Sequence, residues 1–240
     1  MQIDIALQPI VLPMSGQVAS YEVLARRVDP FTGKVTLPMD LVRGTDAVGW
    51  RDIDLAVLAK LRGSLDQIPA HTGLNVNIAP ETIVSPDYWE QYCSLLENLV
   101  RAHTAPLVVE LSERIDIDET DLAQVIGPLR ELGAQIALDD LGAEWASRSR
   151  LAFHSWDICK IDYRPQARAQ VAHWVDDVIA MCRRDNVLTV LEGIESAQDV
   201  LMARRMNVDR CQGYAHGRPF ILTDGLGHSS RASAQGYRSC

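Results

Sequence analysis

The sequence predicts an α/β protein folded as a single β/α barrel, and three observations lead to this prediction. Short apolar runs alternate with helical stripes along the 240 residues, as expected for parallel strands joined by helices. A hairpin-like segment comes first, and roughly seven strand–helix units follow it, close to the number that closes such a barrel. Polar side chains recur where the apolar runs end, at the edge where barrel enzymes place their active sites.

Composition limits the classes of protein to which the chain can belong. The net charge of −9 argues against a nucleic acid polymer as partner, because such binding needs a basic face. No apolar run approaches the roughly 20 residues of a membrane span, and the first residues lack a signal-peptide core. Five scattered cysteines without a CxxC pair argue against zinc and disulfides, and favour a cytoplasmic location. We expect one domain over 1–222 and a flexible Ser/Gly-rich tail over 223–240.

The first half of the chain has clear strand and helix patterns. Residues 3–11 and 18–25 predict a hairpin with a Pro/Gly turn, and residues 27–50 are irregular or short-helical. Apolar residues spaced by four over 53–65 predict a helix. Residues 74–78 predict a strand with Asn75 and Asn77 on one face, where both amides need partners. Ser85 and Pro86 then predict a helix start.

The second half repeats the alternation of strand and helix. Strands are predicted over 107–109, 136–138, 158–159 and 187–191, and a short one over 209–211. Apolar stripes predict helices over 122–132 and 171–182. Ser196 and Asp199 resemble a capping box, which gives Ser196 a structural role. A doubly wound open sheet is the alternative fold, but the sequence has no Gly-rich phosphate loop, which such sheets usually carry.

Polar residues at the predicted strand ends suggest a metal site. All six of the following offer oxygen ligands: Glu22, Asn77, Glu110, Asp139, Asp140 and Glu192. Such a set without histidine or cysteine favours Mg²⁺ or Mn²⁺. So many carboxylates could hold two ions, which suits in-line attack of water on a phosphodiester. Arg26 and Lys160 would contact phosphate or the developing charge.

Seven short motifs then resemble the EAL domain family of bacterial cyclic di-GMP phosphodiesterases, in the family's order. Glu22-Val23-Leu24-Ala25-Arg26 is similar to its ExLxR signature, and Asn77 lies in a strand like its NxS strand. Glu110-Leu111-Ser112-Glu113 resembles its ExxE, and Asp139-Asp140-Leu141-Gly142 its DDFG. Lys160-Ile161-Asp162, Glu192-Gly193-Ile194-Glu195 and Gln212-Gly213-Tyr214 resemble KID, EGVE and QGY. The resemblance covers nearly the whole chain, from Leu7 to Phe220.

This resemblance implies a modified TIM (β/α)8 barrel with one antiparallel strand, and hydrolysis of cyclic di-GMP to linear pGpG. It implies that the six oxygen-bearing residues together hold two metal ions, which are Mg²⁺ or Mn²⁺. Lys160 would position or activate the attacking water, Glu195 would support the site, and Glu113 would anchor the loop after the acid pair. Arg26, Leu24 and Gln212 would contact the substrate. A homodimer and a separate sensor or regulatory protein are possible partners in this family.

The loop after the acid pair departs from the family pattern. The family reads DDFGTGYSS, whereas this chain has Leu141, Ala143 and Glu144 at the corresponding places. Ala143 lacks a hydroxyl, and Glu144 replaces a glycine that can adopt positive φ. The alternative to an active enzyme is therefore a weak or silent EAL domain that binds cyclic di-GMP or a protein partner. An unrelated metal-dependent barrel hydrolase is the third hypothesis.

Overall fold

A computed structural model describes residues 3–44, 49–112, 119–142, 150–152, 156–163 and 174–222. Within them the strands are β1 (Asp4–Val11), β2 (Val18–Val28), β3 (Val35–Thr36), β4 (Gly73–Ile78), β5 (Leu107–Ser112), β6 (Gln135–Leu141), β7 (Ile158–Asp162), β8 (Leu188–Glu192), β9 (Arg210–Gln212) and β10 (Phe220–Ile221). The helices are α1 (Pro38–Arg43), α2 (Trp50–Gly63), α3 (Pro80–Ile83), α4 (Pro86–Ala102), α5 (Glu119–Glu131), α8 (Trp174–Arg184) and α9 (Ala197–Met206), with a 3-10 turn at Leu65–Gln67.

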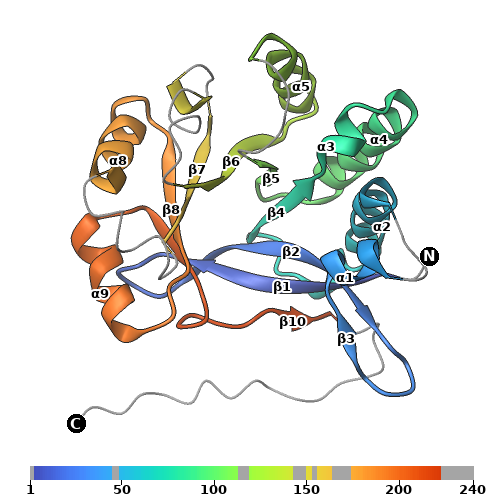
Figure 1. The fold of residues 1–240 in the computed structure, drawn as a ribbon, viewed down its shortest axis with the longest axis horizontal. Helices are drawn as coiled ribbons and strands as arrows, with labels where there is room; N and C mark the ends of the chain where they lie inside the picture. Colours follow the sequence, from blue (N-terminus) through green and yellow to red (C-terminus); the bar gives the residue numbers. More distant parts are fainter. Residues whose placement is uncertain are drawn as a thin grey trace.

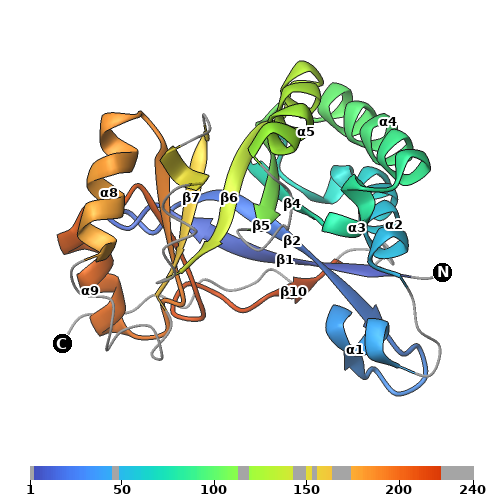
Figure 2. The ribbon, with the colours of Figure 1, turned by 45° about the horizontal axis from the view of Figure 1, so that its top comes forward.

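Eight of the strands close into a barrel in the order β1-β9-β8-β7-β6-β5-β4-β2, because β2 also pairs with β1. β1 runs antiparallel to both of its barrel neighbours, whereas the other neighbouring pairs are parallel. The helices lie around the outside of these strands (Figures 1 and 2). This arrangement confirms the predicted modified TIM barrel with one antiparallel strand, and it excludes the open doubly wound sheet.

The opening hairpin explains why one strand is reversed. A tight turn of 12–17 joins β1 to β2, with Leu12 N donating to Gln17 O at 2.9 Å and Gly16 N donating to Leu12 O at 2.8 Å. Gly16 has φ +72°, a conformation that glycine adopts without a steric penalty. Strands joined by so short a turn must be antiparallel. β2 then enters the parallel series beside β4.

Two apolar clusters lie on opposite faces of the barrel wall. The larger one packs the outward faces of the strands against the helices, for example Leu61 of α2 and Leu96 of α4, both fully buried. The smaller one fills the barrel interior and comprises Ile10, Val108, Ala137, Ile158 and Val190, which are at most 1% exposed. Side chains in parallel barrels fill the interior in layers. This interior layer forms an apolar floor on which a polar layer rests.

Several short elements were not predicted from the sequence. β3 pairs with β2 and β10 pairs with β1, both antiparallel and both outside the closed ring. α3 follows β4 directly. Ser85 lies at the predicted start of α4 but makes no side-chain capping bond, whereas Ser196 forms the predicted capping box with Asp199 at α9. None of the helices in the described ranges combines the length and apolarity needed to cross a membrane.

Candidate active site

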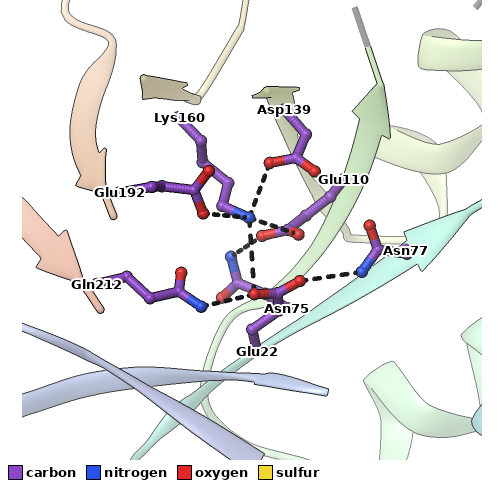
Figure 3. A network of polar contacts seen from close by, with 8 residues as sticks. All are labelled: Glu22, Asn75, Asn77, Glu110, Asp139, Lys160, Glu192 and Gln212. Atoms are coloured by element: carbon purple, nitrogen blue, oxygen red, sulfur yellow. Dashed lines mark hydrogen bonds and ion pairs between the residues drawn. The ribbon is translucent and has the colours of Figure 1, made fainter. Parts of the chain in front are cut away.

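Polar side chains gather at the C-terminal end of the parallel strands, inside the barrel. Side chains two residues apart share one face of a strand, so the residues that follow the apolar floor along β5, β7 and β8 also point inward. Figure 3 shows the network that they form. Its members are Glu22, Asn75, Asn77, Glu110, Asp139, Lys160, Glu192 and Gln212.

Lys160 of β7 stands at the centre of this network. Its ammonium Nζ lies 2.8 Å from Glu110 Oε2, 2.8 Å from Asp139 Oδ1 and 3.1 Å from Glu192 Oε1. Glu22 Oε2 lies farther away, at 3.9 Å. The lysine side chain is 1% exposed, so these carboxylates replace the water that a lysine normally keeps. One cation thus faces four carboxylates, and the site carries excess negative charge.

Amide side chains fix the two deeper carboxylates. Glu22 accepts from Gln212 Nε2 at 2.6 Å and from Asn77 Nδ2 at 3.2 Å, one donor for each oxygen. Glu110 accepts from Asn75 Nδ2 at 2.8 Å with Oε1, and from Lys160 with Oε2. Carboxylates held at both oxygens keep a fixed orientation, which is what a ligand or catalytic group needs.

Burial and mutual repulsion shift the pKa values of these groups. Burial raises the pKa of Glu110 well above its usual range, although Lys160 opposes the shift. Burial likewise raises the pKa of Glu192 to about 8, again against the effect of Lys160. Burial alone would lower the pKa of Lys160, but the surrounding carboxylates outweigh it and raise that pKa well above its ordinary value. Lys160 therefore stays protonated, and protons held by carboxylates offset part of the excess charge.

A divalent cation fits the outer side of this network. Asp139, Asp140 and Glu192 each present a carboxylate oxygen within 4.8 Å of the others. These hard oxygen donors suit Mg²⁺ or Mn²⁺. Asp140 has φ +55°, a left-handed conformation that is uncommon outside glycine and clusters at functional sites. The register of β6 against β7 shifts between Leu138 and Leu141, so the backbone departs from regular strand geometry where the acid pair lies.

An open cavity of about 320 Å³ lies above the network. Asp140, Glu195 and Tyr214 line it, together with the rim of the network itself. Arg26 and Leu24 are half-buried on β2, beyond Glu22 on the same face. Burial lowers the pKa of Arg26 while the charge of Glu22 opposes that shift, and the guanidinium donates to Ala25 O at 2.7 Å. A cavity of this size with acidic walls could take a small ligand together with cations.

The structure brings together most of the residues that the sequence selected. Glu22, Asn77, Glu110, Asp139, Lys160, Glu192 and Gln212 join one network, and Asp140 and Glu195 line the adjoining cavity. Glu113 and the altered loop residues Ala143 and Glu144 lie outside the described residues. The sequence analysis did not select Asn75 as a site residue. Its position two residues before Asn77 was the available signal, because both side chains had to share one face.

Comparison with known proteins identifies the family. A model of the EAL domain matches residues 1–219. The probable cyclic di-GMP phosphodiesterase PdeN of Escherichia coli K12 is 27% identical over 232 residues, which cover 93% of this chain and 44% of PdeN. The cyclic di-GMP phosphodiesterase PdeL of the same organism is 26% identical, over 89% of this chain and 61% of PdeL. The chain thus spans less than two thirds of the length of these relatives.

Solved structures show the same fold. The Bacillus subtilis YkuI protein, with an EAL domain in complex with cyclic di-GMP and calcium, superposes with a TM-score of 0.78 at 20% identity, over 93% of this chain and 57% of that one. A manganese and cyclic di-GMP complex of Klebsiella pneumoniae BlrP1 gives 0.75 at 23% identity, over 92% and 57%. The PaMucR phosphodiesterase, also complexed with cyclic di-GMP, gives 0.72 at 24%, over 91% and 92%.

Proposed function

Since the chain belongs to the EAL domain family, we propose that it is a metal-dependent phosphodiesterase that hydrolyses cyclic di-GMP to linear pGpG. One observation carries the proposal: Lys160 and four carboxylates meet at the C-terminal rim of the barrel, and two of these carboxylates, Asp139 and Glu192, lie close enough to Asp140 to share a cation with it. The names of the relatives support this substrate, because several are cyclic di-GMP phosphodiesterases.

Asp139, Asp140 and Glu192 would hold one Mg²⁺ or Mn²⁺, and Glu22, Asn77 and Glu110 would complete a site for two ions. The ions would stabilise charge on the phosphate and lower the pKa of the attacking water. Lys160, which stays protonated, would orient that water and the carboxylates. Arg26, with Leu24 and Gln212, would bind the substrate, while Glu195 and Glu113 would support the site.

The reaction needs one water and no other reactant. The water oxygen forms a bond to one phosphorus of the ring, and the bond from that phosphorus to the ribose 3′-oxygen breaks. The 3′-oxygen takes up a proton, and the water gives one up. The product is a linear dinucleotide with a 5′-phosphate. Fixed carboxylates contribute mainly by holding the reacting groups in position.

Product analysis tests the proposal. The purified chain is incubated with cyclic di-GMP and either Mn²⁺, Mg²⁺ or EDTA, and the products are separated by liquid chromatography. We expect pGpG only with a divalent cation, and loss of turnover in Glu22→Gln and Asp139→Asn with cooperative unfolding retained. Turnover near the wild-type rate in either variant would contradict the assignment of these carboxylates to the metal site.

A second function is favoured by the sequence of the loop after the acid pair. Ala143 and Glu144 depart from the family pattern, so the domain could bind cyclic di-GMP without cleaving it. Equilibrium dialysis with Ca²⁺ would then show binding while the product assay stays negative with Mn²⁺ and Mg²⁺. A silent domain would signal through a homodimer or through a separate regulatory chain. Size-exclusion chromatography with light scattering tests whether the homodimer forms.

A further inference from the structure

Asn75 lies inside the barrel at the level of its apolar floor. Asn75 is fully buried, and its register partner on β5 is Val108, a member of the interior apolar layer. A valine or leucine at position 75 would continue that layer. A buried amide costs free energy unless its polar atoms find partners, and such local inconsistencies concentrate at functional sites.

The amide group of Asn75 has only one of its two ends satisfied within the described residues. Nδ2 donates to Glu110 Oε1 at 2.8 Å, whereas Oδ1 has no hydrogen-bond partner there. Ser20 Oγ, also buried and on the neighbouring strand β2, is in the same situation. A buried acceptor without a hydrogen-bond partner, such as Asn75 Oδ1, calls for an explanation, which can be a functional role of the same side chain. The purpose that the geometry offers is the bond to Glu110.

Asn75 completes a pattern shared by the two deep carboxylates. Glu22 has a donor on each oxygen, from Asn77 and Gln212. Glu110 likewise has a donor on each oxygen, from Lys160 and Asn75. Without Asn75 the plane of the Glu110 carboxylate would be fixed by Lys160 alone. Lys160 is shared with Asp139 and Glu192, so a rotation of Glu110 would also displace the lysine.

We propose that Asn75 is a positioning residue, which fixes the Glu110 carboxylate from below and thereby sets the affinity of the rim for its divalent cation. The proposal rests on the proposed function, in which Glu110 belongs to the cation site. Partners that orient a ligand in this way commonly contribute about 10- to 100-fold to metal affinity or activity.

The test compares Asn75→Leu with Asn75→Ala, by titrating each protein with Mn²⁺ in a calorimeter without any nucleotide. Leucine fills the space but cannot donate to Glu110. Alanine leaves room for a water, which can donate in place of the amide. We expect Mn²⁺ affinity to fall in the order wild type, Ala, Leu, with the leucine variant about 10- to 100-fold weaker than wild type. A role in packing alone predicts the opposite order, because alanine leaves the larger void.

Controls keep the outcome interpretable. Ile10→Val alters the same interior layer without touching Glu110, and it should bind Mn²⁺ as wild type does. If Asn75→Leu does not fold, the isosteric pair Asn75→Thr and Asn75→Val makes the same comparison, since they differ only in a hydroxyl donor. Leucine equal to wild type, alanine weaker than leucine, or no Mn²⁺ binding by wild type would each overturn the proposal. Mn²⁺ binding without hydrolysis of cyclic di-GMP would instead refute the proposed function and leave this inference standing.

Discussion

Replacing Lys160 with methionine tests the electrostatic core of the site. Methionine has a similar length and no charge, so four carboxylates lose their shared cation. A single charge pair 4 Å apart is worth roughly 4 kcal/mol at an effective dielectric constant of about 20. All four contacts here are shorter than that, at 2.8, 2.8, 3.1 and 3.9 Å. The full repulsion would exceed the stability of a typical domain, so the carboxylates would take up protons instead.

Protonation limits the loss of stability to the usual range for a broken buried pair, about 3–5 kcal/mol. For a chain of this size, each 1 kcal/mol lowers the melting temperature by roughly 2–4 °C. We therefore expect Lys160→Met in EDTA at pH 8 to melt about 6–20 °C below wild type. The difference should shrink at pH 5, where protonated carboxylates no longer need the lysine, and also with saturating Mn²⁺, whose charge replaces it.

Differential scanning calorimetry with and without Mn²⁺ measures these differences. Lys34→Met is the matched control, because Lys34 is exposed and should change the melting temperature by no more than 1–2 °C, about 0.5 kcal/mol. Equal melting temperatures for wild type and Lys160→Met in EDTA at pH 8 would refute the reasoning. A loss of melting temperature that does not depend on pH would also refute it, because only ionised carboxylates repel one another when the lysine is removed.

Three further predictions concern the groups around this core. Burial raises the pKa of Glu192 to about 8 in the metal-free fold. Glu192 therefore keeps its proton in the folded protein at pH values where the same carboxyl group has already lost it in the unfolded chain. That stabilisation is complete at low pH and is lost as pH rises through 8, so the Tm in EDTA should fall from pH 6 to 8.5, less so in Glu192→Gln. Thr82→Val removes a hydrogen-bond donor to buried Asp54, whose pKa burial raises to about 7. The free energy of unfolding in urea should fall by about 1–3 kcal/mol, and by more at pH 8, where Asp54 is ionised, than at pH 6. An equal loss at both pH values would contradict this ionisation. Ala143→Thr with Glu144→Gly, which restores the family loop, should raise kcat more than it changes Kd for cyclic di-GMP; no rise in kcat would show that this loop does not limit turnover.

The barrel could be predicted from the sequence because its signals are local. The Pro13–Gly16 region set the hairpin and hence the reversed strand, and the strand ends set the rim. The short pairings of β3 and β10 were missed, because two-residue strands depend on tertiary contacts that leave no periodic pattern.

Most residues of the network had been selected because they stand at predicted strand ends, but the sequence did not indicate how many carboxylates surround Lys160. The sequence analysis assigns Lys160 to phosphate or water, and in the structure it also lies within ion-pair distance of carboxylates from β2, β5, β6 and β8. That geometry depends on the register between strands far apart in sequence. Asn75 was missed for a related reason, because its depth below Asn77 matters only once the barrel is closed.

In the proposed function, this acidic rim uses a divalent cation to direct water onto cyclic di-GMP. Mass spectrometry of the product formed in ¹⁸O-labelled water tests it most directly. We predict one ¹⁸O atom in the 5′-phosphate of pGpG, with no product in EDTA and restored product after Mn²⁺ is added. Product formation that EDTA leaves unchanged, or the absence of pGpG at every Mn²⁺ and Mg²⁺ concentration, would contradict the claim.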